Sequence, residues 1–264
     1  MIFQTLIGAG LSFFIAYIAY KRASLTDTGL FAAVFFATLI YVSGGFLLWS
    51  LLMVFFISSS LLTKRNKKIR KIHEEKQGRN HIQVIANAGV TTFFAVIYFL
   101  TQQEVFLLAA VTSIAASNAD TWASEIGTLA KGNTFHILTF KKMQKGLSGG
   151  ITWLGTAASA LGALLIAVLF MIGMSITSTI SLSTLIIYGL IISFGGFLGS
   201  IIDSLFGALF QAKYQEKDTG NIYEKKTLNK QTLILVSGFA IITNDMVNFL
   251  STLATSILTV VIFG

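Results

Sequence analysis

Two carboxylates lie close together in an otherwise apolar part of the chain. Asp120 and Glu125 stand in residues 117–128, which continue directly from an apolar stretch. A carboxylate at the centre of a membrane helix costs roughly 2.5–3.5 kcal/mol on insertion scales, so it needs a cation, a partner or a wet cavity. The chain has only eleven acidic residues, and Asp203 and Asp245 also occur in apolar surroundings. We interpret these four acids as a candidate site.

Polar side chains accompany the first two acids at helical spacing. On a regular helix Asn118 and Thr121 share one face with Glu125, because the three are spaced i, i+3 and i+7. Asp120 then points about 140° away from Glu125 at 100° per residue. The two acids therefore either serve different partners or converge because the helix is distorted. The alternative to a site is an interhelical hydrogen-bond network in which the acids pair with nearby Lys131.

The other two acids also have polar or small neighbours. Asp203 stands in a stripe of small and polar residues, with Gly199 four positions before it and Gln211 eight positions after it. Small residues let membrane helices approach closely, so this stripe would bring Asp203 into the interior of a bundle. Asp245 shares a helix face with Asn248 at i, i+3 spacing. For the glycines alone, simple helix packing is the alternative explanation.

The chemistry of these groups favours a magnesium site. Carboxylate, amide and hydroxyl oxygens are hard ligands that suit Mg²⁺ better than zinc or copper. The chain has no cysteine, and its three histidines lack ligand spacing. The predicted metal ligands and catalytic groups are Asp120, Glu125, Asp203 and Asp245. The predicted substrate-binding residues are their polar neighbours and one polar residue of an earlier span: Asn87, Asn118, Thr121, Ser124, Ser204, Gln211, Asn244 and Asn248.

A basic, glycine-rich segment follows the first acids. Lysines precede a turn that would open a helix, so free backbone N–H groups and the helix dipole would face an anion. The predicted phosphate-binding residues are Lys141, Lys142, Lys145, Gly146, Ser148, Gly149 and Gly150. A basic loop with a flexible helix start is the alternative. The chain lacks a G-x-x-x-x-G-K-[ST] loop, because Asn133 stands where residues 127–134 would need lysine.

The composition indicates the elements that must position these residues. Hydrophobic residues make up 54% of the chain and charged residues 11%, and several apolar stretches reach the roughly 20 residues that span a bilayer. We predict an all-α, polytopic transmembrane bundle of about eight spans (7–9), forming a single domain over residues 1–264. The expected spans are 2–20, 29–42, 45–62, 84–101, 105–127, 149–173, 181–211 and 232–262. The chain has no proline, so a break in a helix must come from glycine or polar side chains.

The basic residues predict the orientation. All nineteen Lys and Arg residues fall in four clusters, at Lys21–Arg22 and residues 64–79, 131–145 and 213–230. With the spans above, every cluster lies on one side, which the positive-inside rule identifies as cytoplasmic. We therefore predict a cell-membrane protein with its amino terminus outside and cytoplasmic loops at about 63–83, 128–148 and 212–231. The excess of positive charge is explained by topology, so no nucleic-acid partner is indicated.

Two of the expected spans are too long for a simple crossing. Residues 181–211 and 232–262 each contain 31 residues, or about 46 Å of helix, whereas the hydrocarbon core is about 30 Å thick. Each span is therefore tilted, extends beyond the bilayer or is broken near its acid. If the last span is two helices, the carboxyl terminus returns to the cytoplasm.

Four segments carry a family resemblance: QVIANAG at 83–89, NADTWASEIG at 118–127, residues 195–211 and NDMVN at 244–248. Together they resemble, in order, the integral-membrane family of domain of unknown function ninety-two, which includes transmembrane protein nineteen and the plant phytyl-phosphate kinase. The resemblance implies phosphorylation of an isoprenoid monophosphate to the diphosphate by CTP or ATP, with the four acids as site residues. Relatives tend to show a P-G-T-x-G-G turn, whereas this chain has KGLSGG at 145–150.

We therefore expect a Mg²⁺-dependent prenyl-phosphate kinase whose partners are the bilayer, a prenyl phosphate lipid and a nucleoside triphosphate. Phosphoryl transfer needs positioning and charge neutralisation more than covalent help. The alternative is a cation-coupled transporter or lipid-phosphate carrier, in which intramembrane acids bind the coupling ion. Depth distinguishes the two classes, because an enzyme that uses cytoplasmic nucleotide needs its acids in the cytoplasmic half.

Overall fold

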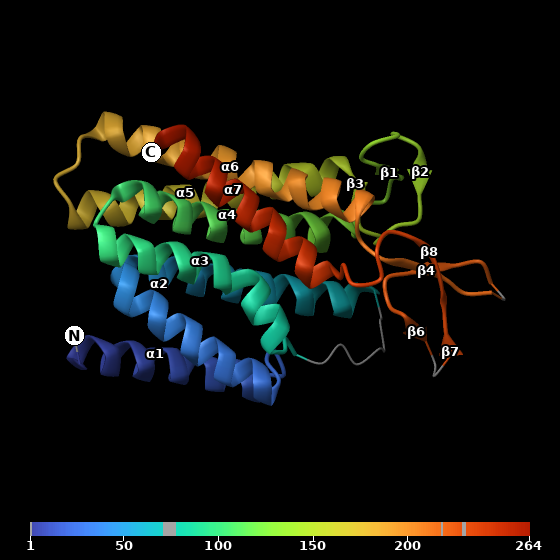
Figure 1. The fold of residues 1–264 in the computed structure, drawn as a ribbon, viewed down its shortest axis with the longest axis horizontal. Helices are drawn as coiled ribbons and strands as arrows, with labels where there is room; N and C mark the ends of the chain where they lie inside the picture. The colour runs from blue at the N-terminus through green and yellow to red at the C-terminus, as the bar shows by residue number, and fades with distance from the viewer. Residues whose placement is uncertain (1, 71–77, 218, 229–230) are drawn as a thin grey trace.

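The computed structural model describes residues 2–70, 78–217, 219–228 and 231–264. Its helices run roughly along one axis, and its strands gather at one end of the bundle (Figure 1). The helices are α1 (Ile2–Lys21), α2 (Asp27–Arg70), α3 (His81–Thr101), α4 (Glu104–Gly127), α5 (Trp153–Thr177), α6 (Leu182–Leu209) and α7 (Asn244–Phe263).

The helices account for the expected number of spans. In the described part of the chain, six helices are long and apolar enough to cross a membrane: α1, α2, α3, α5, α6 and α7. α2 is a hairpin of two segments, because Gly45 adopts a non-helical φ of 72° and ψ of −175° and the two segments run back along each other (Figure 1). With α2 counted as two segments and the 24-residue α4 included, the described part of the chain has eight helical segments that can cross the membrane. The prediction of an all-α membrane bundle is confirmed.

The last two spans are shorter than the sequence suggested. α6 is an unbroken helix of 28 residues, so it is not interrupted at Asp203. α7 is a single helix of 20 residues that begins only at Asn244. Residues 234–237 form an exposed strand instead of the expected helix. These residues are mostly apolar, which explains why they were predicted as part of the last helix. The strand ends before Gly238, which has a φ of 76°.

The connections at one end of the bundle form small antiparallel sheets. β1 (Thr134–His136) lies between β2 (Lys142–Met143) and β3 (Gly150–Ile151), and β4 (Lys213–Gln215) lies between β5 (Ile222–Tyr223) and β8 (Ile234–Ser237). β6 (Thr227–Leu228) pairs with β7 (Gln231–Thr232). We call this the strand end. Both chain termini lie at the opposite end (Figure 1).

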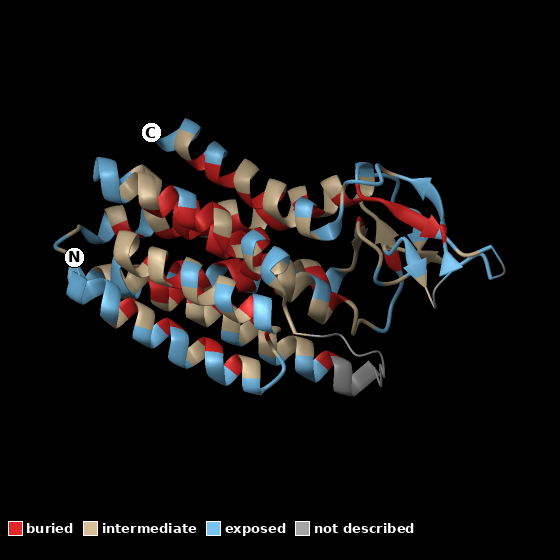
Figure 2. Cartoon of the chain, turned by 60° about the horizontal axis from the view of Figure 1, so that its bottom comes forward, coloured by how far each residue is buried: buried red, intermediate tan, exposed pale blue. Residues whose placement is uncertain are grey.

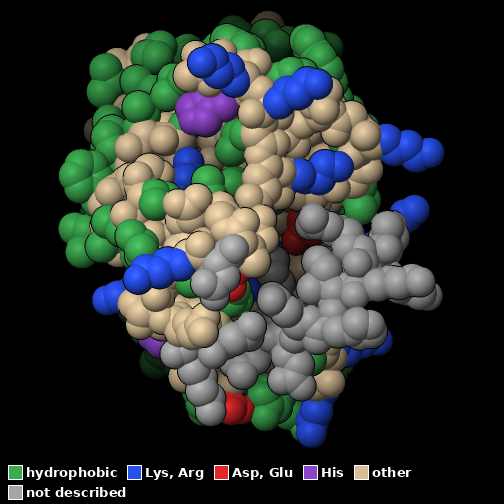
Figure 3. All heavy atoms as spheres, turned by 90° about the vertical axis from the view of Figure 1, so that its right-hand side faces the viewer, with side chains coloured by type: hydrophobic (Ala, Val, Ile, Leu, Met, Phe, Trp, Pro, Cys, Tyr) green, Lys and Arg blue, Asp and Glu red, His purple; other side chains and the backbone are tan. Residues whose placement is uncertain are grey.

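The described basic residues gather at the strand end, as expected if one face of the membrane carries them. Figure 3 views the molecule from this end and shows Lys and Arg side chains distributed around it. The chain is thus a multi-pass membrane protein with a strongly basic end. That this end is cytoplasmic, with the amino terminus outside, stays a prediction.

Helix α4 forms the centre of the bundle. It packs against α2, α3, α5, α6 and α7, and its residues from Leu107 to Ala119 are buried. Figure 2 shows the buried residues concentrated in the middle of the helical layer. Close packing depends on small side chains: a Cβ atom added at Gly199 of α6 would lie 2.5 Å from the Cβ atom of Ala116 of α4. The two helix backbones therefore nearly touch at this point.

Candidate functional site

The close contact between α4 and α6 places two acids opposite each other. The two helices are parallel, since Ala115 meets Gly196 and Ala116 meets Gly199 in the same order. Asp120 and Asp203 each lie four residues beyond the Ala116–Gly199 contact, which is about one helical turn. Their carboxyl groups accordingly come within hydrogen-bonding range of each other. This pair is the core of the candidate site.

Helix α7 supplies hydrogen-bond donors to the pair. Ser251 donates its hydroxyl to Asp203 Oδ2 at 3.0 Å. With its amide nitrogen turned toward α6, Asn248 also donates to Asp203 Oδ2, at 3.0 Å. These two donors hold Asp203 in a defined orientation. The residue is only 8% exposed. Two negative carboxylates this close repel each other unless a proton or a cation lies between them.

A cavity of about 400 Å³ opens from this pair toward the strand end. Its walls are the ends of α4 and α6, the beginnings of α5 and α7, and the glycine-rich turn before β3. Thirteen predicted site residues line it: Asp120, Thr121, Ser124, Glu125, Lys145, Gly146, Ser148, Gly149, Gly150, Asp203, Ser204, Asn244 and Asn248. The structure therefore brings most of the predicted residues to one place.

The glycine-rich turn is docked directly on α6. Gly146 and Gly149 adopt φ values of 87° and 84°, in the left-handed region that favours glycine. A Cβ atom added at Gly207 would lie 2.8 Å from the Cβ atom of Ser148, so the turn rests on α6 one turn after Asp203. The Ser148 backbone N–H donates to Glu224 Oε1 at 2.5 Å. This turn therefore already binds a carboxylate, which is the kind of contact that an anionic phosphate oxygen makes.

The start of α5 contributes to the same wall. Thr152 caps the helix by accepting a hydrogen bond from the Gly155 N–H at 3.0 Å. Thr152, Gly155 and Thr156 all line the cavity, so the positive end of the helix dipole faces it. Lys145 also lines the cavity, and its ammonium group donates to the Ala130 carbonyl. Lys145, the glycine-rich turn and the start of α5 thus line the same cavity as the acid pair.

Glu125 lines the cavity but is tied to the protein. Thr63 and Asn66 of α2 donate to its carboxylate at 2.6 and 2.7 Å. The Arg79 guanidinium also interacts with Glu125 electrostatically. With these contacts, Glu125 connects the end of α4 to α2 and has less free ligand capacity than Asp120. The sequence did not indicate these partners, because nothing in its spacing pairs α2 with α4.

Asp245 differs from the expectation for the four acids. It does not line the cavity and lies half-buried in the first turn of α7. A negative charge at that position stabilises the positive end of the helix dipole, which explains an acid there without a bound metal. The fourth acid of the cavity is instead Glu224, in the segment between β5 and β6.

Five other predicted residues also lie outside the cavity. Asn118 is buried and structural, since its amide donates to the Gly162 carbonyl at 2.7 Å. Asn87 donates to the Gln83 carbonyl at 2.8 Å and lines a different pocket. The other three are Gln211, which is buried just beyond the end of α6, and the exposed Lys141 and Lys142 beside and within β2.

Glu224 was missed because a loop residue has no periodicity from which a position can be read. Its charge acts on Asp203 and on Lys213 of β4. Burial lowers the pKa of Lys213, and the nearby Glu224 partly opposes that shift. Lys213 was also missed as a site neighbour, because its segment was predicted only as a basic cytoplasmic loop.

The acid pair fits a hard cation only in part. Among the described residues, no three Asp, Glu or His side chains gather closely enough to form a ligand set. Asp120 and Asp203 would supply two carboxylates, with Ser204 and Asn248 oxygens along the same wall. Mg²⁺ commonly uses one or two protein carboxylates and takes its remaining ligands from water and substrate phosphates. The donor set is therefore compatible with Mg²⁺ but not with a dedicated four-acid cage.

Comparisons with known proteins agree on the class of the molecule. Protein PGR of Arabidopsis thaliana is 34% identical over 279 residues, covering 97% of this chain and 95% of its own length. The uncharacterized membrane protein MJ0933 of Methanocaldococcus jannaschii is 31% identical over 202 residues, covering 75% of this chain and 80% of its own. No solved structure matches. The family described as integral membrane protein DUF92 matches residues 10–256, and the chain belongs to that family.

Proposed function

We propose that the chain is a membrane-embedded, Mg²⁺-dependent kinase that transfers a phosphoryl group from a nucleoside triphosphate to an isoprenoid monophosphate. One observation carries the proposal: the Asp120–Asp203 pair and an anion-accepting backbone turn line the same cavity at the basic end of the bundle. Phosphoryl transfer needs such a combination of carboxylates for a metal and donors for a polyphosphate.

Each part of the cavity has a role in this proposal. The turn over residues 146–149, the start of α5 and Lys145 bind the polyphosphate of the nucleotide. Asp120 and Asp203 hold the cation, and Mg²⁺ when bound neutralises negative charge on the transferring phosphoryl group. Ser251 and Asn248 orient Asp203. An isoprenoid monophosphate is already an anionic nucleophile, so the site needs no strong general base.

Two observations favour an enzyme over a cation-coupled carrier. Asp120 and Asp203 lie toward the strand end of α4 and α6 rather than at their centres. α6 is continuous through Asp203, whereas carrier sites are typically built on discontinuous helices near the midplane. Acids near one membrane face are accessible to a nucleotide from that side.

The direct test is a transfer assay with purified protein in nanodiscs. Protein with Mg²⁺, labelled ATP or CTP and C15–C55 prenyl monophosphates should yield labelled diphosphates, and a chelator should stop the reaction. Asp120→Asn and Asp203→Asn should each abolish turnover while the protein stays folded. The matched control is Asp245→Asn, which removes an acid outside the cavity and should retain activity. If the wild-type protein yields no diphosphate with either nucleotide, the kinase is rejected and ion-coupled transport becomes the next hypothesis to test.

A further inference from the structure

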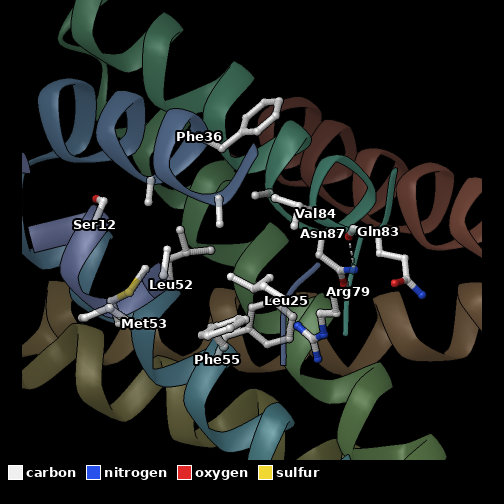
Figure 4. A pocket seen from close by; sticks show the side chains of 16 residues that line it. Ser12, Leu25, Phe36, Leu52, Met53, Phe55, Arg79, Gln83, Val84 and Asn87 are labelled. Carbon is white, nitrogen blue, oxygen red and sulfur yellow. Dashed lines mark hydrogen bonds between the residues drawn. The ribbon is translucent and has the colours of Figure 1, made fainter. Parts of the chain in front are cut away.

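A second pocket lies between α1, α2 and α3, separate from the acid cavity (Figure 4). It has a volume of about 50 Å³ and is lined mainly by apolar side chains. Figure 4 shows Arg79, Gln83 and Asn87 together at one side of the pocket, with Leu52 and Met53 at the other. The pocket is therefore amphipathic, with a cationic group at its polar side.

The backbone around Arg79 is fixed by the loop between α1 and α2. The Arg79 N–H donates to the Ser24 carbonyl at 2.9 Å, and the Arg79 carbonyl accepts from the Thr26 N–H at 3.1 Å. A Cβ atom added at Gly29 would lie 1.9 Å from the Arg79 carbonyl oxygen, so only glycine allows this approach. Arg79 is thus held against the helices and not in a free loop.

The guanidinium of Arg79 is buried among aromatic rings and a hydroxyl group. It lies 5.6 and 5.7 Å from the ring centroids of Phe55 and Phe56, and Nη2 donates to Ser59 Oγ at 2.9 Å. Burial lowers the pKa of Arg79 to about 10, so the group stays protonated at neutral pH. Arginine on aromatic faces still presents donors suited to a phosphate.

The pocket and the acid cavity are linked through α2, where Arg79 donates to Ser59 and Thr63, one helical turn later, donates to Glu125. Arg79 lines the pocket and interacts electrostatically with Glu125, whose side chain lines the acid cavity. A phosphate beside Arg79 would therefore lie on the side of the pocket that is linked through α2 to Glu125. The hydrocarbon chain of the same molecule would extend away from it, along the apolar wall.

We propose that this pocket holds part of the hydrocarbon chain of the isoprenoid monophosphate acceptor, with its phosphate bound by Arg79 and the Gln83 amide. This inference rests on the proposed kinase function, because it places the second substrate of that reaction. At about 50 Å³ the cavity has room for only a short part of one chain, and we expect a single-chain lipid as its occupant. The positive guanidinium favours a phosphate over an alcohol head group.

The test is photolabelling without nucleotide, so that binding is measured apart from catalysis. Protein in nanodiscs is labelled with a farnesyl monophosphate that carries a diazirine on its tail, and the labelled residues are mapped by mass spectrometry. Label is expected on residues of α1, α2 and α3 that line the pocket. Farnesyl monophosphate should compete for labelling, whereas farnesol and dioleoyl phosphatidic acid should compete poorly.

Two substitutions examine the two parts of the pocket. Arg79→Gln should weaken competition by farnesyl monophosphate about ten- to a hundred-fold, the usual effect of losing a charge-assisted hydrogen bond. Its control is Arg22→Gln, since Arg22 is an exposed cation outside the pocket. Ala37→Leu, which fills the pocket from α2, should reduce labelling without removing charge. Its control is Ala160→Leu at an exposed position of α5.

The outcomes separate this inference from the kinase proposal. The pocket assignment is overturned if the label is found on other helices and is unchanged by Arg79→Gln. If that variant does not fold, Ala37→Leu serves in its place. Equal competition by phosphatidic acid overturns it too, because the occupant is then a phospholipid. Specific labelling that depends on Arg79, together with absence of transfer in the kinase assay, leaves the pocket assigned and rejects the kinase.

Discussion

The contact between Gly199 and Ala116 allows a sharp test of how the acid pair is built. In a Gly199→Ala variant the new methyl group would lie 2.5 Å from the Ala116 Cβ atom. Non-bonded carbons normally lie about 3.5–4.0 Å apart, so the two helices must separate locally by about 1 Å or more. Overpacking of this kind typically costs about 1–3 kcal/mol of stability. A displacement of about 1 Å at catalytic groups can lower turnover roughly a hundred-fold.

The assay combines thermal unfolding in nanodiscs with the prenyl-phosphate transfer rate. Gly10→Ala is the matched control, because a Cβ atom at Gly10 of α1 has nothing within 4 Å; it should leave both measurements near the wild-type values. Ala116→Gly should restore the space in the double variant, so the two substitutions should couple strongly in a double-mutant cycle. If Gly199→Ala is as stable and active as Gly10→Ala, the close helix contact does not position Asp120 and Asp203.

Four further predictions concern the strand end and the side of the membrane on which it lies. Glu224→Gln should lower the nucleotide KM by about ten-fold, because it weakens a charged acceptor that competes for the turn's N–H; a raised KM would instead identify Glu224 as a metal ligand. Lys145→Ala should raise the nucleotide KM about ten- to a hundred-fold, whereas Lys142→Ala, outside the cavity, should change it little. In cysteine-free protein, an impermeant thiol reagent outside intact cells should label Ser178→Cys and spare Lys142→Cys; the reverse pattern would invert the orientation. Because burial lowers the pKa of Lys213, the unfolded chain holds its proton to higher pH, so stability should rise with pH between the lowered pKa and about 10.4; Lys213→Met should remove that rise in pH-dependent melting curves.

The membrane class and the number of spans could be predicted from the sequence because they depend on local hydropathy. Asp120 and Asp203 could also be predicted as site residues, because an acid in an apolar segment can be recognised from the neighbouring residues alone. Small residues at helical spacing indicate which face of the helix is buried. The structure places both acids, with Glu125, along one cavity. Asp245 was grouped with them by its apolar setting, but a first-turn position explains that acid as well.

The strand end could not be predicted, because its structure depends on pairing between distant segments. β4 pairs with β8, about twenty residues later in the chain, and no short window of sequence contains that information. The apolar residues of β8 have the hydropathy of a membrane span, so the last helix was predicted to begin too early. Glu224 enters the cavity only through this sheet, which is why neither it nor the Ser148 contact was anticipated.

The geometry of the acid pair has a consequence for recognising similar sites in other chains. Ala116 and Asp120 have the same separation as Gly199 and Asp203, and the two helices are parallel. One residue inserted between Ala116 and Asp120, or between Gly199 and Asp203, would rotate the acid by about 100° about its helix and separate the pair. A change of length in the loop at the opposite end of the bundle would leave the pair intact. The pattern small-x-x-x-Asp, occurring once in each of two parallel spans, is therefore a searchable signature. It specifies two facing carboxylates without reference to loop length or overall sequence similarity.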